Sequence, residues 1–342
     1  MSRLKIAVIG AGLIGRKHIA LIQQSNECDL EAIVDPETST EALATELGVS
    51  RYDELGALLA KRQLDGVILA TPNHMHYSQA MSCIYADVAM LIEKPITQTV
   101  EQAKALVNAI NKVKARVIVG HHRMHSAIMK EAKAIIDRGD IGDIVAVQGS
   151  ALFYKPDDYY LAGAWRTKTG GGPILINMIH EVGNLRYLCG EIVQVQAMPS
   201  NAQRGFEVED TVAILLRFEN GAVGTFLLSD TASSCKSWEQ TSRENLDYHH
   251  DPLENCYHIA GTLGSLSIPT MTVHRFDAGN KPSWYQAMTV EKNPVKVLDP
   301  LQSQLEHFCR VIRREEAPLV SAEDGYRNLL ITEQIADASV KN

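Results

Sequence analysis

The sequence has no surplus of positive charge and no long apolar run. Its 342 residues carry 33 Lys and Arg against 41 Asp and Glu, a formal net charge of −8 at pH 7. An acidic chain repels nucleic-acid phosphates, which excludes nucleic acid as the expected partner. The longest apolar runs, such as residues 5–9 and 66–70, have the length of a strand rather than of a membrane span. We therefore expect neither nucleic-acid binding nor membrane insertion.

Cysteine is scarce and scattered. The six cysteines include no Cys-x-x-Cys pair, so the spacing typical of zinc sites is absent, and a disulfide framework is not expected in a chain of this length. No signal peptide precedes the first strand pattern, which starts at Lys5. These features predict reduced, mostly buried thiols in a cytoplasmic protein.

Strand and helix patterns alternate over the first 122 residues. Short β-branched or apolar runs lie at 5–9, 30–34, 66–71, 88–92 and 116–120. Stretches with apolar residues every three to four positions lie at 13–24, 38–47, 52–60, 75–85 and 99–112. Such alternation predicts a parallel sheet with helices on both faces. Residues 1–122 are expected to form an α/β domain of the Rossmann type.

The pattern changes after about residue 122. Helices are predicted at 126–138, 174–188, 302–313 and 322–338. Strands are predicted at 143–153, 192–198, 210–218, 222–229 and 257–269, with 229–255 as a long polar surface excursion. Residues 123–342 are expected to form an α+β domain with an open, mostly antiparallel sheet. If helices cover one face of that sheet, a second copy is expected on the other, giving a homodimer or homotetramer.

A glycine-rich turn follows the first strand pattern and opens the first helix pattern. It reads Gly10-Ala11-Gly12-Leu13-Ile14-Gly15. In this context Gly10 allows the tight turn, Gly12 lets the backbone approach a pyrophosphate, and Gly15 lets helix and strand pack closely. The N–H groups of the helix N-terminus, including those of Leu13 and Ile14, are suited to phosphate oxygens. The turn predicts dinucleotide binding.

Asp35 stands twenty residues beyond Gly15, at the end of the second strand pattern. A carboxylate there accepts hydrogen bonds from the adenosine ribose and repels a 2′-phosphate. Pro36 and Glu37 follow, with no adjacent Arg or Lys for such a phosphate. The sequence therefore favours NAD over NADP.

Three segments follow the later strand patterns, where ligands bind in open parallel sheets. They are residues 71–76, Glu93-Lys94-Pro95 and His121-His122-Arg123. Because Pro95 restricts the backbone beside it, the Lys94 side chain is aimed, and it can stabilise negative charge that develops on a substrate oxygen.

These motifs resemble those of the Gfo/Idh/MocA family, which groups glucose–fructose oxidoreductase, inositol 2-dehydrogenase and rhizopine-catabolism proteins. The resemblance covers most of the chain. Its pieces are the glycine turn, Thr71-Pro72-Asn73-x-x-His76, Glu93-Lys94-Pro95, and Trp165-Arg166 followed by Gly170-Gly171-Gly172 and His180. It implies a Rossmann domain joined to an open-sheet domain, and NAD- or NADP-dependent oxidation or reduction of sugars, inositols and related polyols.

The resemblance also implies residue roles. Lys94 would be the catalytic lysine and His180 the acid/base residue, since a histidine titrates near neutral pH and can accept an alcohol proton. The residues expected around the nicotinamide half of the cofactor are Thr71, Pro72, Asn73, His76, Glu93, Lys94, His122, Trp165 and Arg166. Candidate substrate residues are Arg123, Tyr154, Tyr160, Asn177 and His180.

One position departs from the family pattern. Members typically carry Asp four residues before the histidine, but here Ile176 stands there and Asn177 follows. On a helix both positions lie beside His180, so Asn177 could bind substrate or orient the imidazole, although it supplies no charge. A subgroup with a similar Ile-Asn-x-x-His run favours a variant site over a broken one.

Two histidine groups invite a metal-site interpretation that we do not adopt. His121, His122 and His125 lie at a strand end, where adjacent side chains point in opposite directions. His249 and His250 lie in the polar excursion and are expected to be solvated. No metal is predicted at either place.

The leading hypothesis is an NAD-dependent dehydrogenase that acts on a secondary alcohol of a sugar, inositol or related cyclic polyol. An acidic substrate stays open because Arg123 and Arg166 could face the pocket. The residues 155–160 could be a substrate-side loop or a turn packed on the sheet, with about equal weight. Two alternatives are a glycosidase that retains NAD and uses transient oxidation, and a dinucleotide-binding sensor without turnover.

Overall fold

The computed structural model describes residues 2–277, 279 and 281–340, which form two compact units. The first unit comprises the described residues up to His125 together with Pro300–Leu329, and the second comprises the rest. The sequence predicts a single division at residue 122, whereas the chain leaves the second unit at Pro300 and returns to it after Leu329. No helix within the described residues combines the length and apolar character needed to cross a membrane.

The first unit is built on a six-stranded parallel sheet. Its strands are β1 (Leu4–Ile9), β2 (Cys28–Val34), β3 (Ser50–Tyr52), β4 (Gly66–Leu69), β5 (Ala89–Glu93) and β6 (Val117–Gly120). Their order is β3-β2-β1-β4-β5-β6, which is the Rossmann order. The near-continuous burial of β4, β5 and β6 explains their unbroken apolar sequence. The predicted α/β class is confirmed.

The short edge strand β3 is absent from the sequence prediction, which had placed residue 52 in a helix. Its residues Ser50, Arg51 and Tyr52 are only half-buried and show no apolar alternation. They become a strand because they pair with Ala32–Val34 of β2, a contact between residues distant in the chain.

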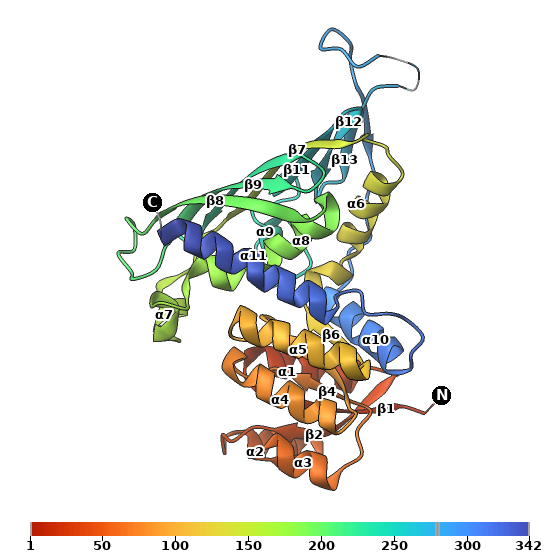
Figure 1. Cartoon of the computed structure of the whole chain (residues 1–342), viewed down its shortest axis with the longest axis vertical. Helices are drawn as coiled ribbons and strands as arrows, with labels where there is room; N and C mark the ends of the chain where they lie inside the picture. The colour runs from red at the N-terminus through yellow and green to blue at the C-terminus, as the bar shows by residue number, and fades with distance from the viewer. Residues whose placement is uncertain (1, 278, 280, 341–342) are drawn as a thin grey trace. The chain divides into compact units, whose positions relative to one another are not determined.

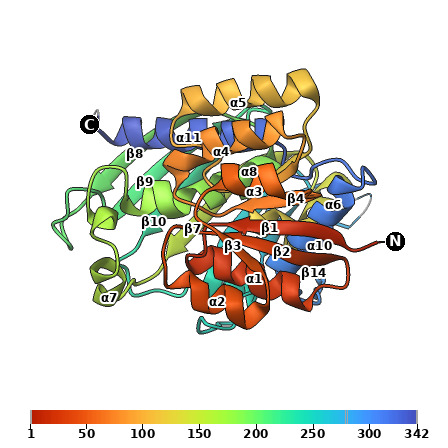
Figure 2. The same cartoon turned by 90° about the horizontal axis from the view of Figure 1, so that it is seen from below.

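Helices cover both faces of this sheet (Figure 2). One face carries α1 (Leu13–Gln24), α2 (Thr40–Leu47) and α10 (Pro300–Ile312), and the other carries α3 (Leu55–Lys61), α4 (Asn73–Tyr85) and α5 (Val100–Val113). The single-turn 3₁₀ helix His122–His125 follows β6.

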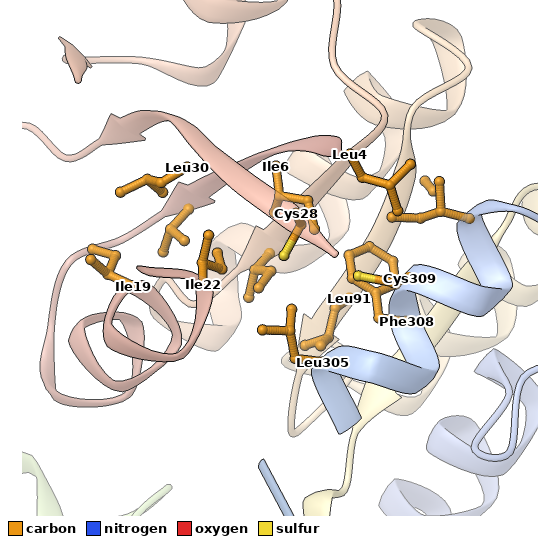
Figure 3. Close-up of a cluster of buried hydrophobic side chains, with 14 of the residues drawn as sticks. Leu4, Ile6, Ile19, Ile22, Cys28, Leu30, Leu91, Leu305, Phe308 and Cys309 are labelled. Atoms are coloured by element: carbon orange, nitrogen blue, oxygen red, sulfur yellow. The ribbon is translucent and has the colours of Figure 1, made fainter. Parts of the chain in front are cut away.

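Helix α10 completes the core of the first unit although it lies almost 180 residues beyond β6. Leu305, Phe308 and Cys309 pack into a cluster with residues of β1 and β2 (Figure 3). A Cβ at Gly66 would lie 2.8 Å from Ile312 Cδ1, so the helix packs directly on β4. An amphipathic pattern shows that a helix has a buried face but not which sheet covers it, and the prediction therefore assigned this helix to the second domain.

The second unit is built on an eight-stranded sheet. Its strands are β7 (Ile144–Leu152), β8 (Ile192–Ser200), β9 (Thr211–Phe218), β10 (Val223–Ser229), β11 (Tyr257–Gly261), β12 (Gly264–Ile268), β13 (Thr272–Arg275) and β14 (Thr289–Lys292). The order is β14-β13-β12-β11-β7-β10-β9-β8, and β7–β10 is the parallel pair. The predicted open, mostly antiparallel sheet is confirmed.

The strand prediction for the last part of this sheet is wrong. The single strand expected over 257–269 is a hairpin of β11 and β12, because the chain turns at Thr262 and Leu263. At Gly264 a Cβ would lie 2.4 Å from the carbonyl oxygen of His274, so only glycine fits where β13 approaches. Strands β13 and β14 were not predicted, because β13 has only one buried residue and the four residues of β14 are all exposed, so neither shows apolar alternation.

One face of this sheet carries helices, as Figure 1 shows for α6 and α8. The helices of the unit are α6 (Ala127–Asp137), α7 (Asp157–Leu161), the 3₁₀ helix Ala164–Thr167, the π-helix Ile174–Met178, α8 (Ile179–Cys189), α9 (Trp238–Ser242) and the later part of α11 (Ala322–Val340).

The segment 229–255 is only in part the surface excursion that its composition predicts: residues 246–249 are exposed, but residues around α9 are buried. Its helix α9 carries the buried Trp238, whose ring lies 5.8 Å from that of Tyr257 in β11. The hydroxyl of Ser237 caps the helix by accepting from Gln240 N. Its many polar residues are satisfied by such local hydrogen bonds, and this allows a polar segment to be packed.

Candidate functional site

The glycine turn has the geometry that a bound pyrophosphate requires. Gly10 has φ +91°, which favours glycine. A Cβ at Gly15 would lie 1.9 Å from the carbonyl oxygen of Gly10, so the helix could not pack as it does with any larger residue. A Cβ at Gly12, in contrast, would meet no atom within 4 Å. The space in front of Gly12 is open to a ligand.

The N-terminus of α1 is suited to an anion. Gly12 is its N-cap and provides no side chain to satisfy the first N–H groups, and the first turn holds no acidic residue. Leu13, the first helical residue, is 82% exposed. Free N–H groups and the positive end of the helix dipole therefore face solvent here, as a phosphate-binding site needs.

Asp35 lies beside this turn. Its Oδ2 accepts from Ala11 N at 2.7 Å, and its Oδ1 accepts from Glu37 N at 2.9 Å. Each carboxylate oxygen keeps a further lone pair for a ribose hydroxyl. The side chain thus both shapes the turn and presents negative charge at its edge.

Arg51 was missed by the sequence reasoning, which looked for a basic residue only next to Asp35. It comes from β3, and its Nη2 donates to the carbonyl oxygen of Pro36 at 3.1 Å. The same guanidinium pairs with Asp53 at 2.9 Å and lies 3.6 Å from Glu41. Only the pairing of β3 with β2, which brings Arg51 close to Pro36, could have indicated this residue.

His76 ties together two of the strand-end segments. It is 1% exposed; Nδ1 lies 2.9 Å from the carbonyl oxygen of Pro95, and Nε2 lies 2.9 Å from that of Thr71. Burial lowers its pKa, against the effect of these two carbonyl groups. Both ring nitrogens thus face backbone carbonyl oxygens, and the neutral ring donates to one of them, while Pro72 and Asn73 are exposed at the start of α4.

Glu93 anchors the segment that carries Lys94. Its Oε1 lies 2.8 Å from Nε2 of His18, a fully buried residue of α1, and its Oε2 accepts from Lys94 N at 3.3 Å. A Cβ at Gly120 would lie 2.8 Å from the Glu93 carboxyl carbon, so β6 also confines this carboxylate. His18 was not predicted as a site residue, although it lies on the helix that follows the glycine turn.

The histidines after β6 are largely buried. Asn328 Nδ2 lies 3.2 Å from Nε2 of His121. Burial, then the charge of Arg123, lowers the pKa of His122 well below its ordinary value, which keeps this imidazole neutral. Arg123 is only 3% exposed. His125 stacks on His307 with ring centroids 5.1 Å apart.

His180 lies in the first turn of α8, in the second unit, and is 8% exposed. The sequence predicts one continuous α-helix here, but Ile174–Met178 is a π-helix, so the turn before His180 is one residue wider. The prediction that Ile176 and Asn177 both lie beside His180 assumed α-helical spacing, and this turn does not have that spacing. Glu181 is buried and accepts a hydrogen bond from the hydroxyl of Tyr257, so it braces α8 against the sheet.

A polar network in the second unit includes residues that the sequence reasoning did not single out. Lys155 Nζ donates to Asn177 Oδ1 at 2.7 Å and lies 3.6 Å from Asp230 Oδ2. Asp230 also accepts from the Tyr160 hydroxyl at 2.7 Å and from Arg204 Nε at 3.2 Å. Tyr160 is buried, and its hydroxyl serves this network. A lysine and an aspartate far apart in the sequence give no local signal of such a pairing.

The remaining candidates lie on the surface of the same unit. Trp165 and Tyr154 are 56% and 55% exposed. The Arg166 guanidinium lies 4.0 Å from the ring centroid of Tyr159 and donates to the Tyr159 carbonyl oxygen. The loop 155–160 thus packs partly on itself, and Arg166 is held against it.

Comparisons with known proteins agree with this fold. A family model described as an oxidoreductase family with an NAD-binding Rossmann fold matches residues 4–121, and the GFO/IDH/MocA C-terminal domain model matches residues 129–267. The rhizopine catabolism protein MocA of Rhizobium meliloti is 25% identical over 191 residues, which cover 56% of this chain and 59% of that protein. Myo-inositol 2-dehydrogenase of Thermotoga maritima is 24% identical over 338 residues, 96% of this chain and 94% of that protein.

A solved structure shares the fold over nearly the whole chain. It is an oxidoreductase from Agrobacterium radiobacter in complex with NAD⁺, L-tartaric acid and magnesium, with a TM-score of 0.81 and 19% identity, covering 99% of this chain and 97% of that one. The resemblance drawn from the glycine turn, Glu93-Lys94-Pro95 and His180 is confirmed. The chain belongs to the Gfo/Idh/MocA family of oxidoreductases, whose N-terminal domain is an NAD-binding Rossmann fold.

Proposed function

We propose that the protein transfers a hydride between nicotinamide and a secondary alcohol of a sugar, inositol or related cyclic polyol. The observation that carries the proposal is the open cradle at Gly12, beneath an uncapped helix N-terminus and beside Asp35. The name of the Thermotoga maritima relative, which aligns over 94% of its length, supports the polyol substrate class.

In this proposal the first unit holds the cofactor. The N–H groups of Leu13 and Ile14 bind the pyrophosphate, and Asp35 accepts from the adenosine ribose hydroxyls. When bound, NAD supplies the hydride acceptor or donor, while the chain supplies orientation and charge. The nicotinamide half is assigned to Thr71, Pro72, Asn73, Glu93, Lys94, His122, Trp165 and Arg166, with His76 fixing the loops that carry them.

His180 and Lys94 share the proton chemistry in this proposal. A neutral imidazole at His180 accepts the hydroxyl proton as the alcohol is oxidised and returns it in reduction. The Lys94 ammonium stabilises the negative charge that develops on the same oxygen. The buried His18–Glu93 pair holds the Lys94 backbone, so the ammonium needs little rearrangement during the reaction.

We further propose that two copies associate through the helix-free face of the second unit's sheet, as a homodimer or as half of a homotetramer in the cytoplasm. A groove of about 920 Å³ lies on this face. Met198, Leu215 and Leu227 line it and are 69%, 53% and 42% exposed. Exposed apolar side chains in such numbers favour burial against a second copy. The free state of the described cysteines agrees with a reducing compartment.

The test compares Lys94→Met with Lys104→Met, an exposed lysine of α5 that serves as the matched control. NADH formation is followed by absorbance across polyols, sugars, sugar acids and cyclic diols, with NAD and NADP in parallel. Lys94→Met should lose at least about a hundredfold in kcat and keep its affinity for NAD, since removing one charge-stabilising group costs this much. Turnover unchanged by Lys94→Met would refute the proposal.

The same screen separates the alternatives. A glycosidase that retains NAD would cleave a glycoside without net NADH, and a sensor would bind NAD and turn over no compound of the panel. Either result would replace the dehydrogenase assignment.

A further inference from the structure

The side chain of Lys155 is held in one place from several sides. Its backbone N–H donates to the carbonyl oxygen of Asp230 at 2.9 Å, and its carbonyl oxygen accepts from Arg204 Nη2 at 2.7 Å. Its Nζ lies 4.8 Å from the ring centroid of Tyr159 and is 3.6 Å from Asp230 Oδ2. The side chain is only 11% exposed. The ammonium is therefore a fixed group, and Asn177 Oδ1 is 2.7 Å from it.

This contact decides the orientation of the Asn177 amide. An ammonium has three donors and no acceptor, so the amide must turn its oxygen toward Lys155. The amide nitrogen then points to another side of the half-buried side chain. Within the residues that the structure describes, no protein group accepts from Nδ2 of Asn177. The N–H donors of Nδ2 are thus available to a ligand.

We propose that Asn177 is a specificity-determining donor that selects substrates with a carboxylate, and that Lys155 is the positioning residue that orients it. This inference rests on the proposed function, because it takes the carboxylate to bind near His180, the proposed acid/base residue three positions after Asn177. The ammonium also polarises the amide, since a hydrogen bond accepted at Oδ1 strengthens the donors at Nδ2. A carboxylate is the best match to such donors because it only accepts and carries charge.

The replacement of the family's aspartate by Ile176, next to Asn177, changes which substrates the site favours. An aspartate in this part of the helix would present only acceptors and would repel an acidic substrate. Here Ile176 removes that carboxylate, and Asn177 places donors near it. The polarity of the position is reversed from acceptor to donor, and we infer an acidic polyhydroxylated substrate such as a sugar acid.

The experiment measures binding to the full-length, NAD-loaded protein by calorimetry. The probes are L-tartrate and L-threitol, which share a carbon skeleton and hydroxyl configuration and differ in carrying carboxylates or neutral CH₂OH groups. The wild type should bind L-tartrate at least about tenfold more tightly, as expected for hydrogen bonds to a charged group. Asn177→Asp has nearly the same shape but replaces the donors by an acceptor, and should abolish this preference by weakening L-tartrate binding.

Lys155 is tested by two substitutions and a control. Lys155→Met should lower L-tartrate affinity about tenfold, whereas Lys155→Arg keeps a donor toward Asn177 and should retain most of it. Lys130→Met, at an exposed position of α6, should change neither affinity.

Two results would overturn the inference: no L-tartrate preference in the wild type, or a preference that survives Asn177→Asp. These results do not depend on turnover. If the protein nevertheless forms NADH from polyols, the dehydrogenase assignment is supported and the role of Asn177 as a carboxylate donor is refuted. If L-tartrate is preferred, the preference depends on Asn177 and no compound is turned over, the role of Asn177 is supported and the dehydrogenase assignment is refuted.

Discussion

Replacing His18 by leucine should impair the reaction without preventing NAD from binding. His18 is fully buried and its Nε2 lies 2.8 Å from Oε1 of Glu93, whose side chain is 8% exposed. The carboxylate can only accept, so Nε2 carries the proton and donates. His18→Leu leaves this buried carboxylate with the weaker 3.3 Å contact to Lys94 N.

The loss can be sized from these contacts. A hydrogen bond to a charged group contributes about 1.5–3 kcal/mol. In a unit of about 150–250 residues each kcal/mol shifts the Tm by about 2–4 °C, so His18→Leu should melt roughly 3–12 °C lower. Because Glu93 fixes the Lys94 backbone, and a displacement of about 1 Å can cost about a hundredfold in rate, kcat should fall by about 10- to 100-fold. NAD affinity should change less than about threefold, since the phosphate cradle is formed by backbone N–H groups at the start of α1, whereas the His18 side chain contacts Glu93.

Thermal melts, NAD titration and steady-state NADH formation measure the three quantities. His18→Gln keeps an N–H donor near the Nε2 position and should recover most of kcat. His74→Leu, at an exposed position of α4, is the matched control and should behave as the wild type. A lower Tm for His18→Leu with unchanged kcat would show that Glu93 only stabilises the fold and does not position Lys94.

Three further predictions concern other parts of the first unit. Burial, with smaller charge effects, lowers the pKa of His125 from 6.5 to about 3. As the pH falls, the unfolded chain therefore binds this proton before the folded chain does. The contribution of His125 to stability is full above pH 6.5, and stability falls by about 1.4 kcal/mol per pH unit below it. The loss of about 2 kcal/mol at pH 5 should disappear from urea titrations of His125→Phe, and an unchanged pH slope would contradict the assignment. Gly15→Ala should destabilise by about 1–3 kcal/mol or more in melts because of its backbone clash, whereas Gly12→Ala should fold normally and lose NAD affinity in a titration; equal melts for both would count against the cradle. Asp35→Ser should reduce the preference for NAD over NADP by about tenfold, because NADP affinity rises once the carboxylate no longer repels the 2′-phosphate. A second substitution, Arg51→Ala, should reverse this rise in NADP affinity if the guanidinium near Pro36 reaches the 2′-phosphate.

The sequence was sufficient for the parts of the molecule that depend on local rules. The turn from Gly10 to Gly15, the carboxylate of Asp35 and all strands of the first sheet except β3 follow from spacing and apolar periodicity, and the structure has them with the expected local geometry. Lys94 at the end of β5 and His180 on α8 were placed on the predicted types of element for the same reason.

Contacts between distant segments could not be predicted in the same way. The strand β3 exists through its pairing with β2, and β14 through its pairing with β13. The bond from Lys155 to Asn177 and the pair of His18 with Glu93 join residues 22 and 75 positions apart, and neither has a local signature. The π-helix at Ile174–Met178 could not be distinguished from an α-helix because both place apolar residues at similar intervals.

The return of the chain to the first unit has a consequence for synthesis in the cell. Leu305 and Phe308 of α10 fill the face of the sheet formed by β1 and β2, which leave the ribosome nearly 300 residues earlier. At about 5–20 residues per second, the nascent Rossmann sheet waits roughly 15–60 s with this face uncovered. Burial of this face of the nucleotide-binding half is therefore tied to the synthesis of α10, and a chain terminated before residue 300 would leave it uncovered.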